Sequence, residues 1–449
     1  MTGDAEARVT GFSTDTRTLA PGQAYVALDG PHFRGAEYAP LAVVSGAPVV
    51  VVPEGSWGIE AGGAAVVAVA DARAALRALG AAAREAHSGP VVGITGSCGK
   101  TSTKDSLATL LGDSLRVVSS PKSYNNDIGV PLTLLMGEPE TEALVLEIGS
   151  NHPGEIEALC KVARPTCGVV TNVFRAHLEG FGSLAGVAEE KGALVEAVDP
   201  SGFVVLNADC PRTMALAERA SAEVVWVRLD EVADVYATDL HSSPAGTTFR
   251  LDGRREVTLP LQGTHAVVNL LMAIGVAERL GVAREALLDR VRDLEPSQGR
   301  LESKRFGGLQ VVDDTYNANP ASAEAAVRVL AGMTGPGARV LVLGDMLELG
   351  DEAIELHARV GRAAASAGID RLIAVGSFAG SVVDGAVEAG MRAANCTDFG
   401  TVAELGAALP GLLNSGDTVL LKGSRGIGLE RLLDGLAESF GEAIGEAVV

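Results

Sequence analysis

The sequence predicts an α/β protein with three domains, and three observations support this fold class. The chain has 449 residues, which at about 150 residues per domain suggests three domains. Short apolar segments alternate with helical patterns along much of the chain, as they do in parallel sheets covered by helices. Glycine is frequent, with 55 residues, but it forms no repeat or tract, so we expect the glycines at turns and ligand-binding loops.

Charge and composition exclude several functional classes. The 57 Asp and Glu residues outnumber the 36 Lys and Arg residues, and a net charge of −21 argues against non-specific binding to nucleic acid or anionic membranes. The N-terminus lacks the apolar core of a signal peptide, and no segment is typical of a membrane span. The five cysteines are scattered without metal-ligand spacing. We therefore expect a cytoplasmic, monomeric protein with reduced thiols, no structural zinc and no membrane insertion.

The first domain is expected to cover residues 1–88 and to combine short strands with turns. It closes with a helix, and a Ser-Gly-Pro turn at residues 88–90 marks the linker that follows. Its predicted elements are strands at residues 23–28, 48–52 and 65–69 and a helix over residues 72–86.

The second domain, residues 89–297, opens with a buried strand over residues 91–95, a glycine-rich loop and a helix over residues 101–111. Further strands alternate with helical patterns, which predicts a parallel sheet with helices on its faces. Alternating Val-rich strands with glycine turns at residues 223–261 predict a small antiparallel addition. The remaining predicted elements are strands at residues 143–146, 168–171 and 203–206 and a helix over residues 266–280.

The third domain, residues 298–449, continues the strand–helix alternation and is predicted to be a Rossmann-like module. Its predicted strands lie at residues 309–312, 339–343, 371–375 and 418–421, each followed by a helical pattern.

The strongest motif lies between the strand and the helix that open the second domain. It consists of Thr95, Gly96, Ser97, Cys98, Gly99, Lys100, Thr101 and Ser102, a TGxxGKT variant of the phosphate-binding loop with Ile at position 94. Glycines let backbone N–H groups close on phosphate oxygens, the lysine bridges the outer phosphates, and a hydroxyl binds Mg²⁺. The motif predicts nucleoside triphosphate binding, against the alternative of a chance glycine-rich turn. We interpret Cys98 as a passive loop residue rather than a reactive thiol.

Further motifs follow along the second domain. They are Asn125–Thr133, Leu146–Ile156, Thr171-Asn172 and His177–Ser183, with Lys191 after them. This series resembles the Mur ligases, the ATP-dependent amide-forming enzymes of peptidoglycan precursor synthesis. The resemblance extends from about Ser13 to the C-terminus.

The third domain narrows the resemblance. Asp313–Pro320, Leu343–Gly350 and Lys422–Arg425 resemble the branch of the family that adds D-alanyl-D-alanine. The Asp-Asn-Pro-Arg motif, typical of the branch that adds the third amino acid, is absent from the sequence. The resemblance implies a ligase that joins D-alanyl-D-alanine to UDP-N-acetylmuramoyl-tripeptide through an acyl phosphate, with ATP hydrolysed to ADP. Two alternatives stay open: a Mur-type amide ligase with a different acceptor, and a P-loop ATPase that acts as a switch without ligation.

Three residues are candidates for the metal sites besides Thr101, and together with Lys100 they are the candidate catalytic residues. Glu147 ends a predicted strand and should face the ligand crevice of an open sheet, although it could also be a solvated carboxylate. The resemblance implies that Glu147 binds Mg²⁺, that His177 binds a second Mg²⁺, and that CO₂ carbamylates Lys191 into a further carboxylate ligand. The alternatives are a structural histidine and a lysine on a solvated helix face.

The resemblance also assigns ligand contacts outside the phosphate-binding loop. Asn269 would contact the adenine side, in a run where Ala266 departs from the family's Asn. Arg300 would reach the ATP phosphates, and Asp314 would bind the ribose or support the domain hinge. The UDP end would be held by Ser13, Thr16 and Arg17, although few residues precede this motif and the run Arg34–Tyr38 lacks the family's His. The remaining substrate contacts implied are Asn125, Asn126 and, for the dipeptide, Tyr316, Asn317 and Asn319. Large domain closure is expected.

Overall fold

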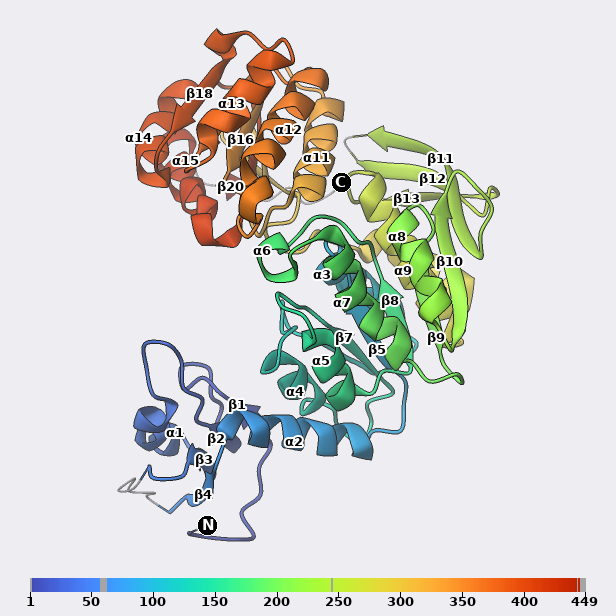
Figure 1. The fold of residues 1–449 in the computed structure, drawn as a ribbon, viewed down its shortest axis with the longest axis vertical. Helices are drawn as coiled ribbons and strands as arrows, with labels where there is room; N and C mark the ends of the chain where they lie inside the picture. Colours follow the sequence, from blue (N-terminus) through green and yellow to red (C-terminus); the bar gives the residue numbers. More distant parts are fainter. Residues whose placement is uncertain (1, 57–62, 244, 442, 445–449) are drawn as a thin grey trace.

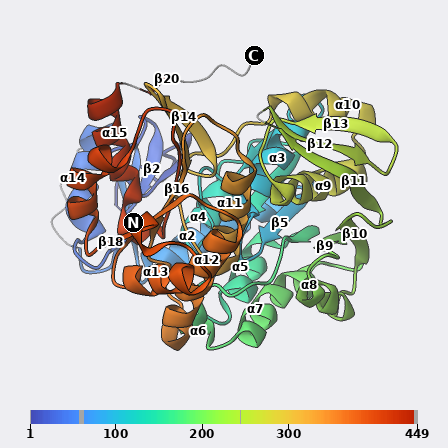
Figure 2. The ribbon, with the colours of Figure 1, turned by 90° about the horizontal axis from the view of Figure 1, so that it is seen from above.

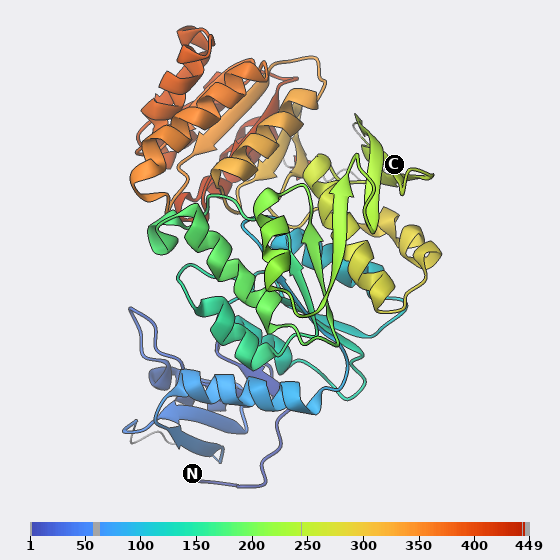
Figure 3. The ribbon, with the colours of Figure 1, turned by 45° about the vertical axis from the view of Figure 1, so that its right-hand side comes forward.

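The strands of the chain form three sheets that follow one another along the sequence, each covered by helices (Figure 1). The computed structural model describes residues 2–56, 63–243, 245–441 and 443–444. Within these ranges the three sheets have four, nine and seven strands. The predicted α/β fold class is confirmed, and Figure 3 shows the N-terminal and C-terminal sheets at opposite ends of the molecule.

The N-terminal sheet is parallel throughout, in the order β1-β2-β3-β4. Strand β1 was not predicted, because three residues of mixed polarity carry no alternation signal. Helix α2 begins where the Asp71 carboxylate accepts the backbone N–H groups of Arg73 and Ala74. The elements are β1 (Gly11–Ser13), β2 (Gln23–Val26), α1 (Ala39–Val44), β3 (Val49–Pro53), β4 (Ala65–Val69) and α2 (Ala72–Ala86).

Helix α2 joins the N-terminal sheet to the central domain. One apolar core contains Val26 and Val51 from the sheet, Leu76 from α2 and Leu132 from α4 (Gly129–Leu134). Gly80 allows the close approach, because a Cβ at this position would lie 2.7 Å from Pro131 Cα. Figure 1 shows α2 lying between the N-terminal sheet and helices α4 and α5.

The central sheet has the order β13-β12-β11-β10-β9-β8-β5-β7-β6. Strand β5 therefore lies between β7 and β8, and the strand order reverses beside it, where ligands bind in open α/β sheets. Its strands are β5 (Val91–Thr95), β6 (Val117–Ser119), β7 (Ala143–Glu147), β8 (Cys167–Val170), β9 (Phe203–Asn207), β10 (Glu223–Leu229), β11 (Val235–Ser243), β12 (Gly246–Leu251) and β13 (Arg255–Leu259). Besides α4, its helices are α3 (Lys100–Leu111), α5 (Glu155–Ala163), α6 (Leu178–Phe181), α7 (Leu184–Ala197), α8 (Pro211–Ala215), α9 (Thr264–Arg279) and α10 (Arg284–Arg290).

The predicted antiparallel addition is only partly antiparallel. Strands β11, β12 and β13 pair antiparallel, but β10 is parallel to both β9 and β11, and all four continue the central sheet. Alternation along a strand predicts which side chains share a face and carries no information about strand direction. Direction follows from the connection, and here α8 carries the chain from β9 back to the start of β10.

The C-terminal sheet has the order β18-β17-β16-β19-β15-β14-β20, and its predicted strands are all present. Strands β15 to β19 are parallel, as expected of a Rossmann-like module. Seen from above, helices α13 and α14 and strands β11–β13 lie on opposite sides of the molecule (Figure 2). The strands are β14 (Glu302–Phe306), β15 (Leu309–Asp314), β16 (Arg339–Gly344), β17 (Arg371–Val375), β18 (Cys396–Phe399), β19 (Thr418–Lys422) and β20 (Ala443–Ile444). The helices are α11 (Pro320–Gly332), α12 (Ala353–Ser366), α13 (Ala379–Glu388), α14 (Val402–Leu412) and α15 (Leu432–Phe440).

None of the helices in the described ranges combines the length and the apolar character needed to cross a bilayer. The cysteines are free thiols, three of them buried and two partly exposed.

Candidate active site

A cavity of about 710 Å³ lies between the central and C-terminal domains. The carboxyl ends of β5, β7 and β8 form one wall, and the segments that follow β15, β16 and β19 form the other. Ligands bind at the carboxyl ends of strands in open α/β sheets, so the ligand-binding edges of two sheets face the same cavity. The predicted site residues that line it are Ser97, Cys98, Gly99, Lys100, Thr101, Ser102, Asn125, Glu147, His177, Asn269, Arg300, Asp314, Tyr316, Asn317 and Asn319.

The phosphate-binding loop is held open by hydrogen bonds to the segment after β8. The Cys98 N–H donates to Asn172 Oδ1 at 3.0 Å, and the Thr171 hydroxyl donates to the Cys98 carbonyl at 2.6 Å. Lys100 begins α3, and its ammonium donates to the Gly96 carbonyl at 2.8 Å. Burial lowers the pKa of Lys100, although the nearby charge of Glu147 acts in the opposite direction. The loop thus presents a partly buried ammonium where phosphates would bind.

Glu147 is a buried carboxylate, and its hydrogen-bond donors among the described residues are neutral. The residue is 1% exposed at the end of β7. The Thr101 hydroxyl donates to Oε2 at 2.7 Å, and the Asn125 amide donates to Oε1 at 2.8 Å. A buried carboxylate without a paired cation is unfavourable, and a hydroxyl beside it is a suitable further oxygen ligand. These donor atoms fit a divalent cation.

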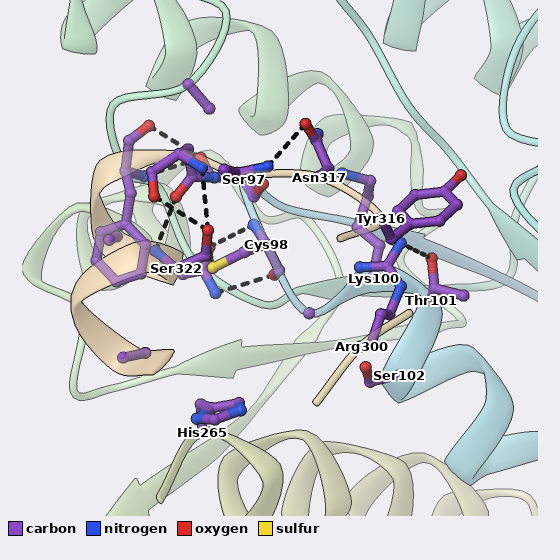
Figure 4. A pocket seen from close by; sticks show the side chains of 18 of the residues that line it. Ser97, Cys98, Lys100, Thr101, Ser102, His265, Arg300, Tyr316, Asn317 and Ser322 are labelled. Carbon is purple, nitrogen blue, oxygen red and sulfur yellow. Dashed lines mark hydrogen bonds between the residues drawn. The ribbon is translucent and has the colours of Figure 1, made fainter. Parts of the chain in front are cut away.

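Arg300 connects the linker before β14 to the phosphate-binding loop. Its Nη2 donates to the Thr101 hydroxyl at 2.9 Å, and its guanidinium lies 4.2 Å from the centre of the Tyr316 ring (Figure 4). The Tyr316 hydroxyl donates to Ser123 Oγ at 2.5 Å. The predicted phosphate contact and the predicted dipeptide contact are therefore adjacent side chains.

The ends of the C-terminal strands carry a second set of polar groups. Lys422 donates to Asp314 Oδ2 at 2.6 Å and to the Asn317 carbonyl at 3.1 Å. Burial raises the pKa of Asp314, although the Lys422 charge acts in the opposite direction. Asn319 caps α11 and also donates from its amide to the Ser97 carbonyl at 3.4 Å, across the domain boundary.

His177 lies at the boundary between the two domains. Its Nδ1 is in close contact with the Glu348 carboxylate, and the Glu179 N–H donates to the Glu348 carbonyl at 3.1 Å. His177 and Glu348 both have left-handed backbones, with φ of 53° and 61°. Burial lowers the pKa of His177, which favours the neutral imidazole that metals bind. The structure thus brings a predicted metal ligand from the central domain against a carboxylate of the C-terminal domain.

Lys191 lies behind the cavity wall. It is 2% exposed on α7, and within the described residues its ammonium has no hydrogen-bond partner. Burial, together with the nearby charge of Lys100, lowers the pKa of Lys191 to about 7. The alternative of a solvated helix face therefore does not apply to this lysine.

The adenine-side candidates lie at the start of α9. Asn269 is buried against the phosphate-binding loop, where a Cβ at Gly99 would lie 2.6 Å from Asn269 Oδ1. His265 also lines the cavity, and burial lowers its pKa to about 4, helped by the charges of Lys422 and Arg328. His265 is consequently a neutral imidazole at pH 7.

Several predicted residues do not line this cavity. Ser13 and Thr16 lie in the N-terminal domain, as does Arg17, which is 86% exposed and paired with Asp15 at 2.6 Å. The Asn126 side chain instead accepts the N–H of Gly129, the first residue of α4, at 2.9 Å. Three other predicted residues, Thr95, Gly96 and Lys191, lie behind the lining.

The cavity contains residues to which the sequence interpretation gave no role. Four of them lie within or beside recognised motifs: His265, Asn172, Glu348 and Lys422. Proximity to a motif or to a strand end could therefore have predicted that they line the cavity. Helices α11 and α12 contribute a further group that no local pattern indicated, because the direction of their faces depends on domain packing. This group is Glu324, Arg328 and Arg359.

Substitution of Gly99 by alanine is expected to weaken ATP binding about ten-fold. The residue has φ +84°, and the new Cβ would collide with the Asn269 amide, so both strain and displacement of the loop follow. Calorimetric titration with ATP measures the loss. Gly281→Ala is the matched control, because Gly281 has φ +89° and no atom near its Cβ direction. Equal losses of affinity in both variants would contradict the loop assignment.

Comparisons with known proteins show similarity in both sequence and fold. The Mur ligase middle domain family model matches residues 94–277, and the model described as Mur ligase, glutamate ligase domain matches residues 299–425. The UDP-N-acetylmuramoyl-tripeptide–D-alanyl-D-alanine ligase of Escherichia coli is 38% identical, over 97% of this chain and 95% of its own. A crystal structure of MurF from Acinetobacter baumannii superposes with a TM-score of 0.85 at 33% identity, covering 96% and 94% of the two chains. MurF from Thermotoga maritima, solved in complex with ADP, has a TM-score of 0.83 at 26% identity and covers 98% and 99%.

Proposed function

This chain belongs to the Mur ligase family, and on that premise we propose that it joins D-alanyl-D-alanine to UDP-N-acetylmuramoyl-tripeptide with hydrolysis of ATP. The observation that carries this proposal is the shared cavity, in which the phosphate-binding loop faces Tyr316, Asn317 and Asn319 of the C-terminal domain. An amide bond between a carboxylate and an amine needs both reactants beside the nucleotide. A switch ATPase would not need the second wall.

The side chains support activation of the carboxylate as an acyl phosphate. A carboxylate is a poor electrophile, and transfer of the γ-phosphoryl group supplies a leaving group. The Lys100 ammonium would contact the oxygens of the transferred phosphoryl group. Arg300, in the linker before β14, would contact the ATP phosphates. The amine of the dipeptide then attacks the acyl carbon, and phosphate leaves. Charge stabilisation in a desolvated cavity is the main contribution expected of these residues.

Thr101 and Glu147 would hold the Mg²⁺ that accompanies ATP. When bound, this ion would neutralise charge on the phosphate oxygens. The fit rests on the buried carboxylate of Glu147 and the adjacent hydroxyl. Asn125 orients the carboxylate through its second oxygen.

Lys191 and His177 would serve a second ion. The unprotonated amine of Lys191 would add CO₂, form an N–C bond and release one proton to water, which gives a carbamate, a carboxylate-like ligand longer than Glu. The lowered pKa, about 7, supports this because the reactive form is abundant at neutral pH. His177 would have to exchange the Glu348 carboxylate for the ion, or share it.

The remaining assignments complete the proposal. The domains cover residues 1–88, 89–297 and 298–449, and bind the UDP end, ATP and the dipeptide in chain order. Ser13, Thr16 and Arg17 would hold the UDP end, and the Arg17 guanidinium suits a diphosphate. Asn269 and Asp314 would contact adenosine, and Asn125 and Asn126 the peptide side. The enzyme would act as a cytoplasmic monomer, in the compartment that supplies ATP.

Phosphate release with defined acceptors tests the proposed function. Purified protein with ATP, Mg²⁺ and the tripeptide nucleotide should release phosphate with D-alanyl-D-alanine and not with D-alanine, L-lysine or diaminopimelate. Release with single amino acids alone would favour the Mur-type ligase with another acceptor. Release without any acceptor or nucleotide-linked peptide would favour the switch ATPase. Tripeptides that end in diaminopimelate or lysine, compared in the same assay, identify the third residue.

A further inference from the structure

Lys104 is a buried cation outside the cavity lining. It lies one turn after Lys100 on α3, and its side chain is 3% exposed. A buried ammonium is unfavourable unless its three protons are all accepted. Its Nζ lies 2.6 Å from the Ser120 carbonyl, 2.9 Å from the Lys122 carbonyl and 2.9 Å from Asp105 Oδ1. All three protons of the ammonium therefore have an acceptor.

Two of these acceptors belong to the loop of residues 120–126, which supports the site at several points. The Ser120 hydroxyl accepts the Glu147 N–H at 3.1 Å, and the Asn125 amide orients the Glu147 carboxylate. Further along, Ser123 accepts the Tyr316 hydroxyl. Lys122 has φ +48°, a conformation that the surroundings must maintain. The Lys104 ammonium supports this conformation by donating a hydrogen bond to the Lys122 carbonyl.

The third acceptor connects Lys104 to the interdomain linker. Asp105 Oδ2 accepts the Ser297 hydroxyl at 2.5 Å, and the Ser297 carbonyl accepts the Arg300 N–H at 2.9 Å. The next residue, Leu301, has φ +52°, which is unfavourable for a bulky side chain. One ion pair on α3 is thus bonded to both segments that support Tyr316 and Arg300.

We propose that Lys104 and Asp105 are a positioning pair that fixes the 120–126 loop and the 297–301 linker relative to the phosphate-binding helix. Neither residue lines the cavity, so both act through Glu147, Tyr316 and Arg300. The pair makes the dipeptide side of the site dependent on the helix that binds the nucleotide. The kinetic part of this inference rests on the proposed ligase function, and the structural part does not.

Hydrogen exchange of the full-length protein, measured by mass spectrometry, tests the structural part. Lys104→Met should raise exchange about ten-fold in residues 120–126 and 297–301, with exchange in β5 and β17 unchanged. Ser297→Ala should raise exchange in residues 297–301 only. Lys161→Met is the matched control, because Lys161 lies on α5 with a 71% exposed side chain. Unchanged exchange in both segments, or a uniform rise in all domains, would overturn the proposal.

Steady-state kinetics separate positioning from a purely structural role. A displaced arrangement should lower kcat about 10–100-fold in Lys104→Met while affinity for ADP without Mg²⁺, which depends on the phosphate-binding loop rather than on Glu147, changes less than about three-fold. Parallel loss of this ADP affinity and of kcat would show general damage to α3 and reject the pair.

The test also covers a Lys104→Met variant that does not fold and a wild-type protein that makes no product. If Lys104→Met does not fold, Asp105→Asn and Ser297→Ala test the proposal, because these variants keep the Lys104 contacts to the loop. A lower kcat together with faster exchange confined to the linker supports the proposal. Wild-type kcat and wild-type exchange in these variants refute it. If the wild-type protein makes no product from the tripeptide nucleotide, the proposed function fails and the exchange result still stands, because exchange is measured without substrates.

Discussion

Lys100→Met is expected to reduce kcat for ligation about 10³-fold, equivalent to roughly 4 kcal/mol of transition-state stabilisation. Methionine retains most of the side-chain length and loses the charge. The Lys100 side chain is partly buried, so its attraction to the transferred phosphoryl oxygens is screened less than that of an exposed lysine. The phosphoryl oxygens interact with the Lys100 ammonium most strongly during transfer. The substitution should therefore lower kcat more than it raises KM for the peptide.

Rapid-quench measurement of ADP formation at saturating substrates checks this expectation. Lys161→Met, the same replacement at an exposed site, should retain wild-type turnover, and thermal unfolding should show that both variants fold. A loss below about ten-fold in Lys100→Met would mean that the ammonium does not contact the reacting phosphate.

Lys191→Gln is expected to lower ligation about 10²-fold, because the carbamate ligand cannot form. The pH dependence of carbamylation has a definite sign. With the pKa of Lys191 at about 7, the reactive amine makes up about one tenth of the population at pH 6 and about nine tenths at pH 8. Incorporation of ¹³C-labelled CO₂, followed by NMR, should therefore rise through this range. An ordinary lysine would remain almost fully protonated throughout it.

The control for the label is Lys161→Gln, which should keep the full carbamate signal. Absence of any signal in the wild-type protein between pH 6 and 9 would remove the carbamate from the mechanism. In that case a loss of activity in Lys191→Gln would report only the substitution of a buried side chain.

Much of the fold could be predicted because its signals are local. Helix α2 was predicted at its observed bounds from its helical pattern, and β5 as a short buried strand. The direction of β10 could not be predicted, because it depends on how α8 returns the chain. That information lies in the connection and the sheet, and no residue of β10 records it.

The candidate site shows the same division. Lys100, Thr101 and Glu147 were predicted from strand ends and a loop motif, and the structure places them in contact or side by side. The contact of His177 with Glu348 joins residues 171 positions apart and needs the C-terminal domain in place. Similarly, the burial of Lys104 has no signature in a helix whose partly buried and buried positions both include Thr and Lys.

The packing of α2 against α4 has a consequence for substrate choice. Since a Cβ at Gly80 would collide with Pro131 and the two domains share one core, we expect the N-terminal sheet and the phosphate-binding loop to move together. If Ser13, Thr16 and Arg17 hold the UDP end as proposed, the span from that end to Lys100 is then constant, whatever the C-terminal domain does. Such a span acts as a molecular ruler: a UDP-linked peptide one residue shorter would leave its carboxylate short of the phosphate by about 3.5 Å. A precursor that is too short would be rejected because its carboxylate does not reach the phosphate, before any of its side chains is recognised.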